Sequence, residues 1–321
     1  MANDTPVLTE AELRDLVPLD LALVDTVEKA FIALSEGRVV MPPVMSMDLP
    51  KVHGEVDVKT AWIEGFDSFA IKISTGFFDN RKLGFASLSG LMVLHSARTG
   101  LVDALLVDNG LLTDLRTAAA GAVAARALSR ADTSTVAVLG TGMQARLQLQ
   151  AICLVRPIST AFIWGRDEEK ALALARGMSE KLGIDAHRAA TIEDAVARAD
   201  IAITTTLART PLIAEEMIHP GLHITAMGSD QPGKTEVAPG VLRQANRLVC
   251  DTIAQSRAMG ELYAAEQKGV PAEELGPVEL GAVLTGQVQG RTTDSDVTVC
   301  DLTGTGVQDT AIASLAFQRW Q

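Results

Sequence analysis

The stretch Thr135-Val-Ala-Val-Leu-Gly140-Thr141-Gly142-Met143-Gln144-Ala145 decides the fold of this 321-residue chain. Its apolar first half is typical of a β-strand, it turns through Gly-x-Gly-x-x-Ala, and a helical run at 146–155 follows. In a dinucleotide-binding unit, Gly140 permits the tight turn and Gly142 lets the backbone approach a pyrophosphate at the helix N-terminus. We therefore expect a cofactor to contact Gly140, Thr141, Gly142, Met143 and Gln144. A glycine-rich turn without a nucleotide is the alternative.

Segments downstream of Ala131 repeat the same order of strand and helix. Helical stretches separate short β-branched runs at 135–139, 161–164, 201–204, 224–227, 247–250 and 297–300. Regular alternation of strand and helix predicts a parallel, doubly wound α/β sheet. Ligands of such sheets bind at the carboxyl ends of the strands, so chemistry is expected in the loops that follow these runs.

Residues before Ala131 show a different pattern. Apolar residues recur every three or four positions over 9–37 and predict a helix. Short strand-like runs broken by Gly, Pro and Asp-Asn extend over 39–104 and predict a mostly antiparallel sheet. An Ala-rich helical segment, 109–131, is expected to cross between two domains, and the closing segment 306–321 is again helical.

Composition argues against several classes of protein. Asp and Glu number 40 against 28 Lys and Arg, a formal charge of -12, whereas a nucleic-acid binder normally carries a basic surface. The length suggests two domains. No apolar run reaches the roughly 18 residues that a membrane helix needs, and the first residues lack the pattern of a signal peptide. We therefore expect a cytoplasmic protein with no nucleic-acid or membrane partner.

Cysteine and histidine residues indicate neither a disulfide framework nor a metal site. Cys153, Cys250 and Cys300 are odd in number, widely spaced and set in apolar runs, which is typical of reduced core thiols. The 5 histidines show no HExxH or comparable ligand spacing. No metal is expected.

The end of the second parallel strand bears on the choice between NAD and NADP. An NAD enzyme normally has an acid there that bonds the adenosine ribose. Gly165 occupies that position here and Arg166 follows it, a pattern that suits the 2′-phosphate of NADP. Asp167 is an alternative ribose ligand, and Arg166 is alternatively a solvated surface residue. The residues lean to NADP and leave the choice open.

Three charged residues outside the glycine loop are candidates for chemistry. Asp230, in Gly228-Ser-Asp-Gln-Pro-Gly-Lys-Thr-Glu236, is placed to handle a proton, although an Asx turn explains it equally well. Lys72 lies in an apolar strand, where burial demands a partner or an anionic ligand; snorkelling at the sheet edge is the commoner case. Arg116 presents a fork suited to a carboxylate, while a surface ion pair with Asp114 is again commoner.

Together these motifs resemble the ornithine cyclodeaminase/μ-crystallin family over nearly the whole chain. The resemblance rests on Ile71-Lys-Ile73 ahead of Asp79-Asn80, Leu112-Thr-Asp-Leu-Arg-Thr-Ala-Ala119, Gly140-Thr-Gly-Met-Gln-Ala145, Gly228 to Glu236, and Asp301-Leu-Thr-Gly304 before Gln308-Asp309. It implies an α+β substrate-binding and dimerisation domain made from 1–125 and 305–321, beside a Rossmann domain at 126–304. It also implies a homodimer, and hydride transfer between nicotinamide and a carbon that bears an amine or imine.

Residue roles follow from the same resemblance. Lys72 matches the family lysine near the reacting centre, and Arg116 matches the arginine that holds the substrate α-carboxylate. Asp230 matches the aspartate that accepts a proton from a substrate amine. Gly165 and Arg166 resemble the NADP-type ending of μ-crystallin. Further cofactor contacts are expected from Thr204, Thr205, Thr206, Met227, Gly228 and Thr303.

One departure bears on the substrate. Many family members have Pro-Pro-Arg in the first domain, whereas this chain has Pro42-Pro43-Val44, so one clamp for the carboxylate is missing. Asp57 and Lys59 instead resemble the subgroup associated with ectoine utilisation and with reduction of iminosuccinate to aspartate, and they are expected near the substrate. We predict NAD(P)H-dependent reduction of a small carboxylated imine, with iminosuccinate to L-aspartate as the first candidate. The alternatives are a cyclodeaminase that uses NAD catalytically and releases ammonia, and a non-enzymatic binding protein of the μ-crystallin kind.

Overall fold

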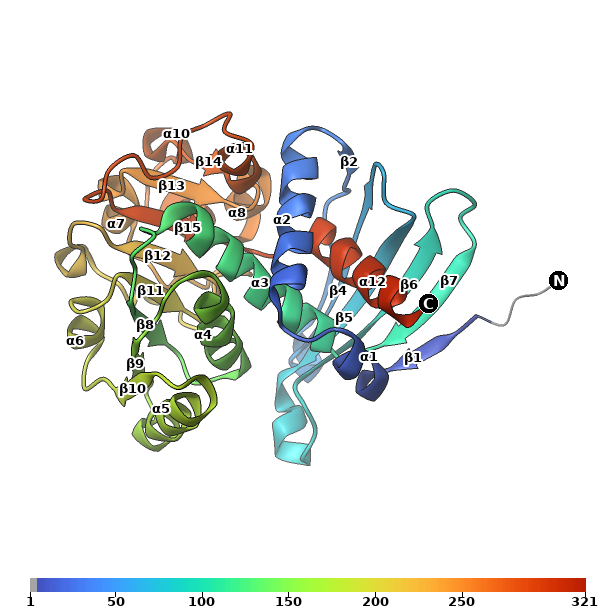
Figure 1. The fold of residues 1–321 in the computed structure, drawn as a ribbon, viewed down its shortest axis with the longest axis horizontal. Helices are drawn as coiled ribbons and strands as arrows, with labels where there is room; N and C mark the ends of the chain where they lie inside the picture. The colour runs from blue at the N-terminus through green and yellow to red at the C-terminus, as the bar shows by residue number, and fades with distance from the viewer. Residues whose placement is uncertain (1–4) are drawn as a thin grey trace. The chain divides into compact units, whose positions relative to one another are not determined.

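The protein divides into two compact units. The computed structural model describes residues 5–321 and separates Met1–Thr117 with Thr305–Gln321 from Ala118–Gly304. The boundary lies inside helix α3 (Leu111–Leu128), earlier in this helix than residue 125. Figure 1 shows the red C-terminal helix among the blue and cyan segments of the first unit, so this unit is built from both ends of the chain.

A largely antiparallel sheet forms the centre of the first unit. Its strand order is β1-β7-β6-β5-β4-β2 with β3 paired to β4, and β1 pairs with β7 in parallel. The predicted, mostly antiparallel sheet is confirmed. The strands are β1 (Val7–Thr9), β2 (Val39–Val40), β3 (Met45–Leu49), β4 (Gly54–Ile63), β5 (Ser68–Phe77), β6 (Leu88–Ser96) and β7 (Val102–Val107).

The single helix predicted over 9–37 is wrong. Two helices, α1 (Glu10–Leu16) and α2 (Leu21–Ser35), take its place. Pro18 has no N–H to donate to a continuing helix. Asp20 instead begins a new one, because its side chain accepts a hydrogen bond from N of Leu23 at 2.8 Å and so caps α2.

The C-terminal helix α12 (Gly306–Trp320) covers one side of this sheet. It contacts α2, β4 and β5, and Figure 1 shows it crossing the strands beside α2. The contact buries a small apolar cluster of Ala30, Ala33, Ala61, Ile63, Val307 and Ala311. Two 3-10 turns, η1 (Pro50–Val52) and η2 (Phe78–Leu83), complete the first unit.

A parallel sheet of 8 strands forms the centre of the second unit, in the order β10-β9-β8-β11-β12-β15-β13-β14. The predicted doubly wound sheet is confirmed: the chain passes from β8 outward to β9 and β10, then returns to the other side of β8 as β11. The strands are β8 (Thr135–Leu139), β9 (Thr160–Trp164), β10 (Asp185–Arg188), β11 (Ile201–Thr204), β12 (His223–Ala226), β13 (Arg247–Cys250), β14 (Val278–Glu279) and β15 (Thr298–Asp301). Such a reversal of direction is the point at which doubly wound sheets bind dinucleotides.

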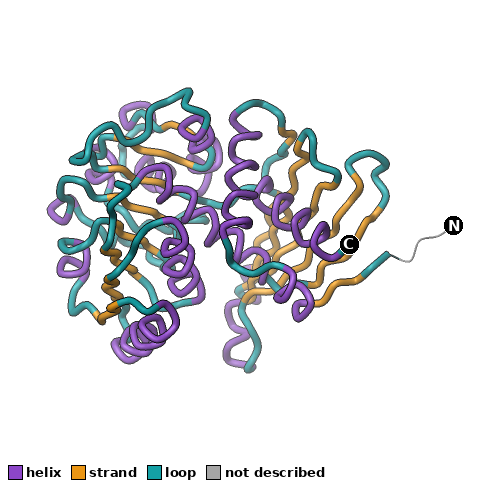
Figure 2. The backbone as a smooth tube through the Cα atoms, viewed as in Figure 1, coloured by secondary structure: helices purple, strands orange, loops and turns teal. Residues whose placement is uncertain are grey.

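Helices surround this sheet, as the purple and orange segments of Figure 2 show. Every residue of β11, β12 and β15 is buried, so these strands reach a ligand only through the loops at their ends. No helix within residues 5–321 is both long and apolar enough to cross a membrane. The helices are α4 (Met143–Val155), α5 (Glu168–Leu182), α6 (Ile192–Val196), η3 (Glu215–Met217), α7 (Pro239–Gln244), α8 (Ile253–Met259), α9 (Glu261–Gln267), α10 (Ala272–Leu275) and α11 (Leu280–Leu284).

Candidate active site

The loop between β8 and α4 requires glycine at its first position. Gly140 has φ of 139°, and a Cβ there would lie 2.3 Å from Oγ1 of Thr205. N of Gly140 also donates a hydrogen bond to the carbonyl oxygen of Trp164 at 2.8 Å. The ends of β8, β9 and β11 therefore meet at this turn.

Gly142 is explained by a ligand better than by the fold. Its φ of -84° suits any residue, and a Cβ at this position would have no described atom within 4 Å. Gly142 is the N-cap of α4 and has no side chain to accept from the first turn, and Met143 beside it is 57% exposed. Backbone N–H groups and open space at a helix N-terminus suit a pyrophosphate. These residues therefore fit the phosphates of a dinucleotide.

The end of β9 has no acid in the position of a ribose ligand. A Cβ at Gly165 would lie 2.5 Å from Cγ2 of Thr141, so glycine leaves room for the phosphate loop. Arg166 is exposed. Asp167 is the N-cap of α5: it accepts from N of Lys170 at 3.1 Å and pairs with Nζ of the same residue at 3.1 Å. Asp167 thus has a structural role, and discrimination between NAD and NADP by Arg166 stays a prediction.

Glu236 joins the loops that follow β11 and β12. Its buried carboxylate accepts hydrogen bonds from Oγ1 of Thr204 (2.6 Å), from N and Oγ1 of Thr206 (both 2.6 Å) and from N of Gly228 (2.7 Å). Burial raises the pKa of Glu236, and the hydrogen bonds from Thr204 and Thr206 act against that rise. Three residues predicted as cofactor contacts thus share one buried acceptor.

Met227 and Thr303 lie at the same edge of the sheet, after β12 and β15. Met227 is buried. N of Thr303 donates to Oδ2 of Asp251 at 2.8 Å, and Nε2 of Gln255 donates to Oγ1 of Thr303 at 2.9 Å. Burial raises the pKa of Asp251. The strand ends thus gather the predicted cofactor residues, and their contact with a cofactor stays a prediction.

Asp230 forms an ion pair with the lysine of its own motif. Nζ of Lys234 lies 2.6 Å from Oδ1 of Asp230, and the two side chains are 9% and 49% exposed. Neither sequence interpretation of Asp230, as a proton acceptor or as an Asx turn, includes this pair. A nearly buried cation therefore offsets the charge of Asp230.

Lys72 and Arg116 meet at one buried carboxylate in the first unit. Nζ of Lys72 lies 2.9 Å from Oδ2 of Asp309, and Nε of Arg116 lies 3.1 Å from Oδ1. Nη1 of Arg116 donates to Oε1 of Gln308 at 2.6 Å. We call these four residues the Lys72 cluster. Lys72 is 3% exposed and Arg116 5%, so a snorkelling lysine and a surface arginine are both wrong.

Strand register places Lys72 beneath α12. Alternate residues of β5 are buried, and Lys72 follows Ala70 on that side. N of Ala70 donates to Oγ1 of Thr310 in α12 at 3.1 Å. The start of α12 is held close to β4, because a Cβ at Gly306 would lie 2.4 Å from the carbonyl oxygen of Thr60. The first turn of α12 therefore brings Asp309 to Lys72.

The Lys72 cluster carries an excess of positive charge. Burial lowers the pKa of Lys72 from 10.5 to about 7; Arg116 and Lys59 act in the same direction and Asp309 against it. Burial alone would raise the pKa of Asp309, but Lys72, Arg116 and Lys59 outweigh it and the net shift is downward. Asp309 therefore stays ionised while Lys72 titrates near neutral pH.

Further charged residues surround this cluster. Lys59 of β4 stands opposite Lys72 of β5, so the two share one side of the sheet. Asp57, two positions earlier, shares that side and accepts from Oγ of Ser46 at 2.6 Å. Asp108 accepts from a backbone N–H in the first turn of α3 at 2.8 Å, and burial raises its pKa to about 6. Lys59 is thus the cation closest in register to Lys72.

Sequence reasoning assigned no role to Gln308, Asp309 or Glu236. Gln308 and Asp309 are polar residues of the C-terminal helix, and both are 0% exposed. Buried polar side chains need hydrogen-bond partners, so their position in this helix is the feature that could have marked them as site residues. Nε2 of Gln308 has no hydrogen-bond partner among the described residues, which leaves a donor beside Arg116. Glu236 gives a weaker signal, as the last residue of the Asp230 motif.

The three cysteines are free thiols. Cys250 and Cys300 are buried, as predicted, whereas Cys153 is only half-buried. Burial raises the pKa of all three, that of Cys153 to about 11, so they stay protonated and are poor nucleophiles. Within residues 5–321, no group of three or more His, Cys, Asp or Glu side chains is placed to hold a metal ion.

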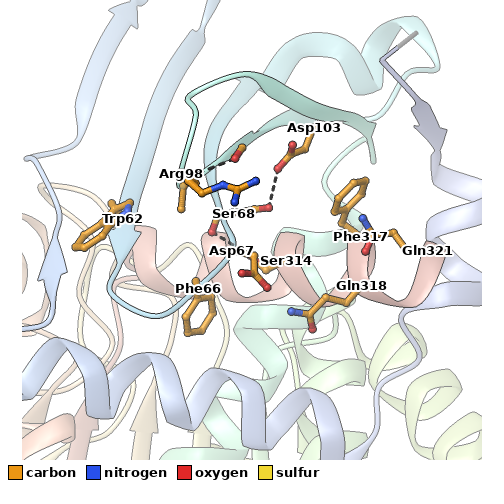
Figure 3. A pocket seen from close by; sticks show the side chains of 12 residues that line it. Trp62, Phe66, Asp67, Ser68, Arg98, Asp103, Ser314, Phe317, Gln318 and Gln321 are labelled. Atoms are coloured by element: carbon orange, nitrogen blue, oxygen red, sulfur yellow. Dashed lines mark hydrogen bonds between the residues drawn. The ribbon is translucent and has the colours of Figure 1, made fainter. Parts of the chain in front are cut away.

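A separate cavity of about 590 Å³ lies within the first unit, beside the C-terminal end of α12 (Figure 3). Oγ of Ser68 donates to Oδ2 of Asp103 at 2.8 Å, and Arg98 extends beside this pair. The aromatic residues that line the cavity are Trp62, Phe66 and Phe317. No member of the Lys72 cluster lines this cavity, so we assign it no part in the chemistry.

Comparison with known proteins identifies the family. Residues 3–321 match the model of the ornithine cyclodeaminase/mu-crystallin family. The chain belongs to this family. A protein of Rhizobium meliloti (strain 1021) with a provisional dehydrogenase name is 54% identical, covering 98% of this chain and 95% of that protein. A protein of Sinorhizobium fredii (strain NBRC 101917 / NGR234) named as an uncharacterized cyclodeaminase is 52% identical, with the same coverage. The two names imply different reactions, so they do not decide the reaction of this chain.

Solved structures of nicotinamide-dependent enzymes share the fold. Δ(1)-pyrroline-2-carboxylate reductase of Thermococcus litoralis, in complex with NADH and L-proline, has a TM-score of 0.92 at 27% identity, covering 98% of this chain and 97% of that one. An archaeal alanine dehydrogenase dimer with bound NAD gives 0.91 at 30%, covering 98% and 95%. The iminosuccinate reductase of Paracoccus denitrificans in complex with NAD+ gives 0.90 at 28%, covering 99% and 96%. These relatives are oxidoreductases that act on C=N or CH–NH2 groups.

Proposed function

We propose that this chain is an NAD(P)H-dependent reductase of a small carboxylated imine, with iminosuccinate, reduced to L-aspartate, as its substrate. The observation that carries the proposal is the Lys72 cluster with Lys59 beside it, because all three cations act on the carboxylate of Asp309. Within the cluster two buried cations, Lys72 and Arg116, face one buried carboxylate, and this balance favours a substrate with more than one negative charge. Iminosuccinate has two carboxylates.

Each member of the cluster has a distinct task in this proposal. Arg116 holds the α-carboxylate, because a guanidinium has five N–H donors and can bind substrate and Asp309 through different ones. Nε2 of Gln308 supplies a second donor beside it. Lys59, opposite Lys72 in the register of β4 and β5, meets the second carboxylate.

Lys72 is the proton donor. A bound NAD(P)H would supply the hydride that reaches the imine carbon. Reduction of C=N to CH–NH then needs one proton at nitrogen, and an ammonium group with a pKa of about 7 can give it up near neutral pH. Asp309 keeps the ammonium oriented at 2.9 Å and raises its pKa, so a larger fraction of Lys72 is protonated at neutral pH than burial alone would allow.

Asp230 is the candidate proton acceptor when an amine is the substrate. In the reductive direction its negative charge would repel a dianion. The ion pair with Lys234 offsets that charge. Asp57, tied to Ser46, is proposed to fix the strand that carries Lys59.

The cofactor is proposed to lie along the second unit's carboxyl edge. Gly140, Thr141, Gly142, Met143 and Gln144 hold its phosphates, and the loops after β11, β12 and β15 hold its other half. Arg166 is exposed where a 2′-phosphate would lie in an NADP enzyme, whereas the structural relatives above contain NADH or NAD. Both cofactors are therefore to be tested.

We infer that two copies of the chain associate through the sheet of the first unit. α12 occupies one side of β4 and β5. On the other side, Met45 pairs with Val58 of β4, four positions before Trp62, and Met45 and Trp62 are 64% and 38% exposed. A second copy would cover these apolar side chains and close the open sheet edge. Light scattering at micromolar concentration should give the mass of a dimer, and a monomer would contradict the inference.

The test of function is a screen of cofactor oxidation. Purified protein receives NADH or NADPH with oxaloacetate, pyruvate or glyoxylate, each with ammonia, or with a cyclic imine. Fastest oxidation with oxaloacetate and ammonia, which form iminosuccinate, supports the proposal. Turnover of cyclic imines alone would contradict the dicarboxylate assignment. Ammonia release from ornithine without net cofactor change would identify a cyclodeaminase, and cofactor binding without any turnover would identify a binding protein.

A further inference from the structure

Glu236 lies outside every helix and strand, yet its side chain is completely buried. It lies in the segment before α7, and its own backbone is fixed because N of Glu236 donates to Oε1 of Glu261 at 2.7 Å. A buried carboxylate in a loop is costly unless donors surround it. The donors come from two other loops, at Thr204, Thr206 and Gly228.

The two loops follow strands on one particular side of β8. In a sheet of this order the glycine turn after β8 takes the pyrophosphate, and the end of β9 takes the adenosine ribose. The second mononucleotide half, beyond β8, begins with β11 and β12. The loops held by Glu236 therefore belong to the nicotinamide half of the cofactor site.

The loops touch each other as well as Glu236. A Cβ at Gly228 would lie 2.2 Å from the carbonyl oxygen of Thr206 and 2.6 Å from Oε2 of Glu236. Thr205, between the two threonines, is the residue against which Gly140 packs. A displacement of the Thr204–Thr206 loop would therefore disturb both the Gly228 turn and the cofactor loop.

Both oxygens of Glu236 are required as acceptors. Oε1 accepts from N and Oγ1 of Thr206, and Oε2 accepts from Oγ1 of Thr204 and N of Gly228. Each oxygen thus serves one hydroxyl, which can rotate, and one backbone N–H, which cannot become an acceptor. A glutamine at this position would replace one of the two oxygens with an NH2 group. Whichever oxygen is replaced, the NH2 group would face a backbone N–H, of Thr206 or of Gly228, and two donors cannot bond to each other.

We propose that Glu236 is a positioning residue, which sets the loops after β11 and β12 in the arrangement that binds the nicotinamide half of the cofactor. The inference rests on the proposed function and adds to it a residue that need not touch the cofactor. It requires that loss of one acceptor at Glu236 weakens binding of the whole dinucleotide while binding of its adenosine diphosphate half is kept.

The experiment compares NADH and ADP binding to wild-type protein and to Glu236→Gln. We expect the variant to bind NADH about tenfold more weakly or worse, since one buried backbone N–H loses its acceptor, and to bind ADP within about twofold of wild type. NADH is titrated by its fluorescence and ADP by calorimetry. Thr204→Val, which removes a single hydroxyl donor at a fully buried position, should give the same split with a smaller loss of about threefold, and it serves if Glu236→Gln does not fold.

Asp296→Asn is the matched control. Asp296 also accepts from two threonines through both N and Oγ1, but it lies before β15, at the amino end of the sheet. It should lower thermal stability and leave both affinities unchanged. Unchanged NADH affinity in Glu236→Gln, or equal losses for NADH and ADP, would overturn the positioning role. Wild-type protein that binds neither ligand would instead overturn the proposed cofactor site, and this inference with it.

Discussion

Asp309 of the first unit and Glu236 of the second are both completely buried carboxylates, and they are stabilised in different ways. Asp309 lies against the charged groups of Lys72 and Arg116, which bring its pKa below the usual value. Glu236 is surrounded by hydroxyl and backbone N–H donors, and burial raises its pKa. The first arrangement keeps titratable charge at the site, whereas the second fixes the backbone with neutral groups.

This difference separates two kinds of function. Cations that face a carboxylate can also bind the carboxylate of an anionic substrate. A lysine with a pKa of about 7, as at Lys72, can in addition give up a proton near neutral pH. Backbone donors cannot titrate, so they determine only where the loops lie. Changes in the Lys72 cluster should therefore affect turnover and its pH dependence, and changes around Glu236 should affect cofactor affinity.

The largest effect is expected from Lys72→Met. Removing the proposed proton donor should lower kcat by about 10²- to 10⁴-fold. NADH affinity should be unchanged, because the cofactor loops belong to the second unit. Lys59→Met is the matched variant: it removes a charge opposite Lys72 and should lower kcat/KM only about tenfold, and only for a dicarboxylate. Equal losses in the two variants would contradict a specific proton-transfer role for Lys72.

Arg116→Lys should have the next largest effect. It keeps the charge beside Asp309 but replaces the fork with a point charge, so a bidentate carboxylate contact is lost. We expect kcat/KM to fall about 10- to 100-fold, mostly through KM, since a hydrogen bond to a charged group contributes roughly 1.5–3 kcal/mol. Steady-state kinetics with varied oxaloacetate and fixed ammonia measure this. A change in kcat alone would argue against substrate binding by Arg116.

Asp309→Asn sharpens the comparison through pH. If protonated Lys72 is the donor in the reductive direction, as proposed, kcat/KM of the wild-type protein should fall as pH rises through about 7. Asp309 raises the pKa of Lys72, so its removal should move this fall to lower pH. The whole pH profile from 5 to 9 is the measurement. A fall at the same pH in both proteins would show that Lys72 is not the group that titrates.

Arg166→Ala should have the smallest effect and concerns cofactor choice alone. Arg166 is exposed, and any contact with a 2′-phosphate would be partly screened by solvent. We expect NADPH affinity to fall about three- to tenfold, with NADH affinity unchanged. Fluorescence titration of both cofactors measures the ratio. Equal changes for NADH and NADPH would remove Arg166 from the choice.

Local patterns were sufficient to predict the second unit. The residues from Thr135 to Ala145 contain their own strand, turn and helix signals, and the structure has β8, the Gly140 turn and α4 in that order. The break at Pro18 is also a local signal, and it was outweighed by the apolar spacing on either side. Gly165 is explained only by the contact with Thr141, which depends on the three-dimensional approach of two loops.

The Lys72 cluster could not be assembled from local patterns. Lys72 and Asp309 are 237 residues apart in sequence, and Arg116 and Gln308 are 192 apart. These residues come together because α12 packs on the sheet of the first unit. Apolar residues such as Val307 and Ala311 hold it there. The sequence pointed to Lys72 and Arg116, through their charge in apolar surroundings and through resemblance, but gave no role to Asp309, the group that joins them.

The central claim is net reduction of an imine carbon, and deuterium transfer tests it most directly. The protein is incubated with NADH or NADPH that carries deuterium at both C4 positions of the nicotinamide, together with oxaloacetate and ammonia, and the amino acid product is examined by mass spectrometry and NMR. The account predicts L-aspartate with one deuterium at the α-carbon, formed in equal amount to the oxidised cofactor. Cofactor that stays reduced, or aspartate without deuterium at that carbon, would contradict it.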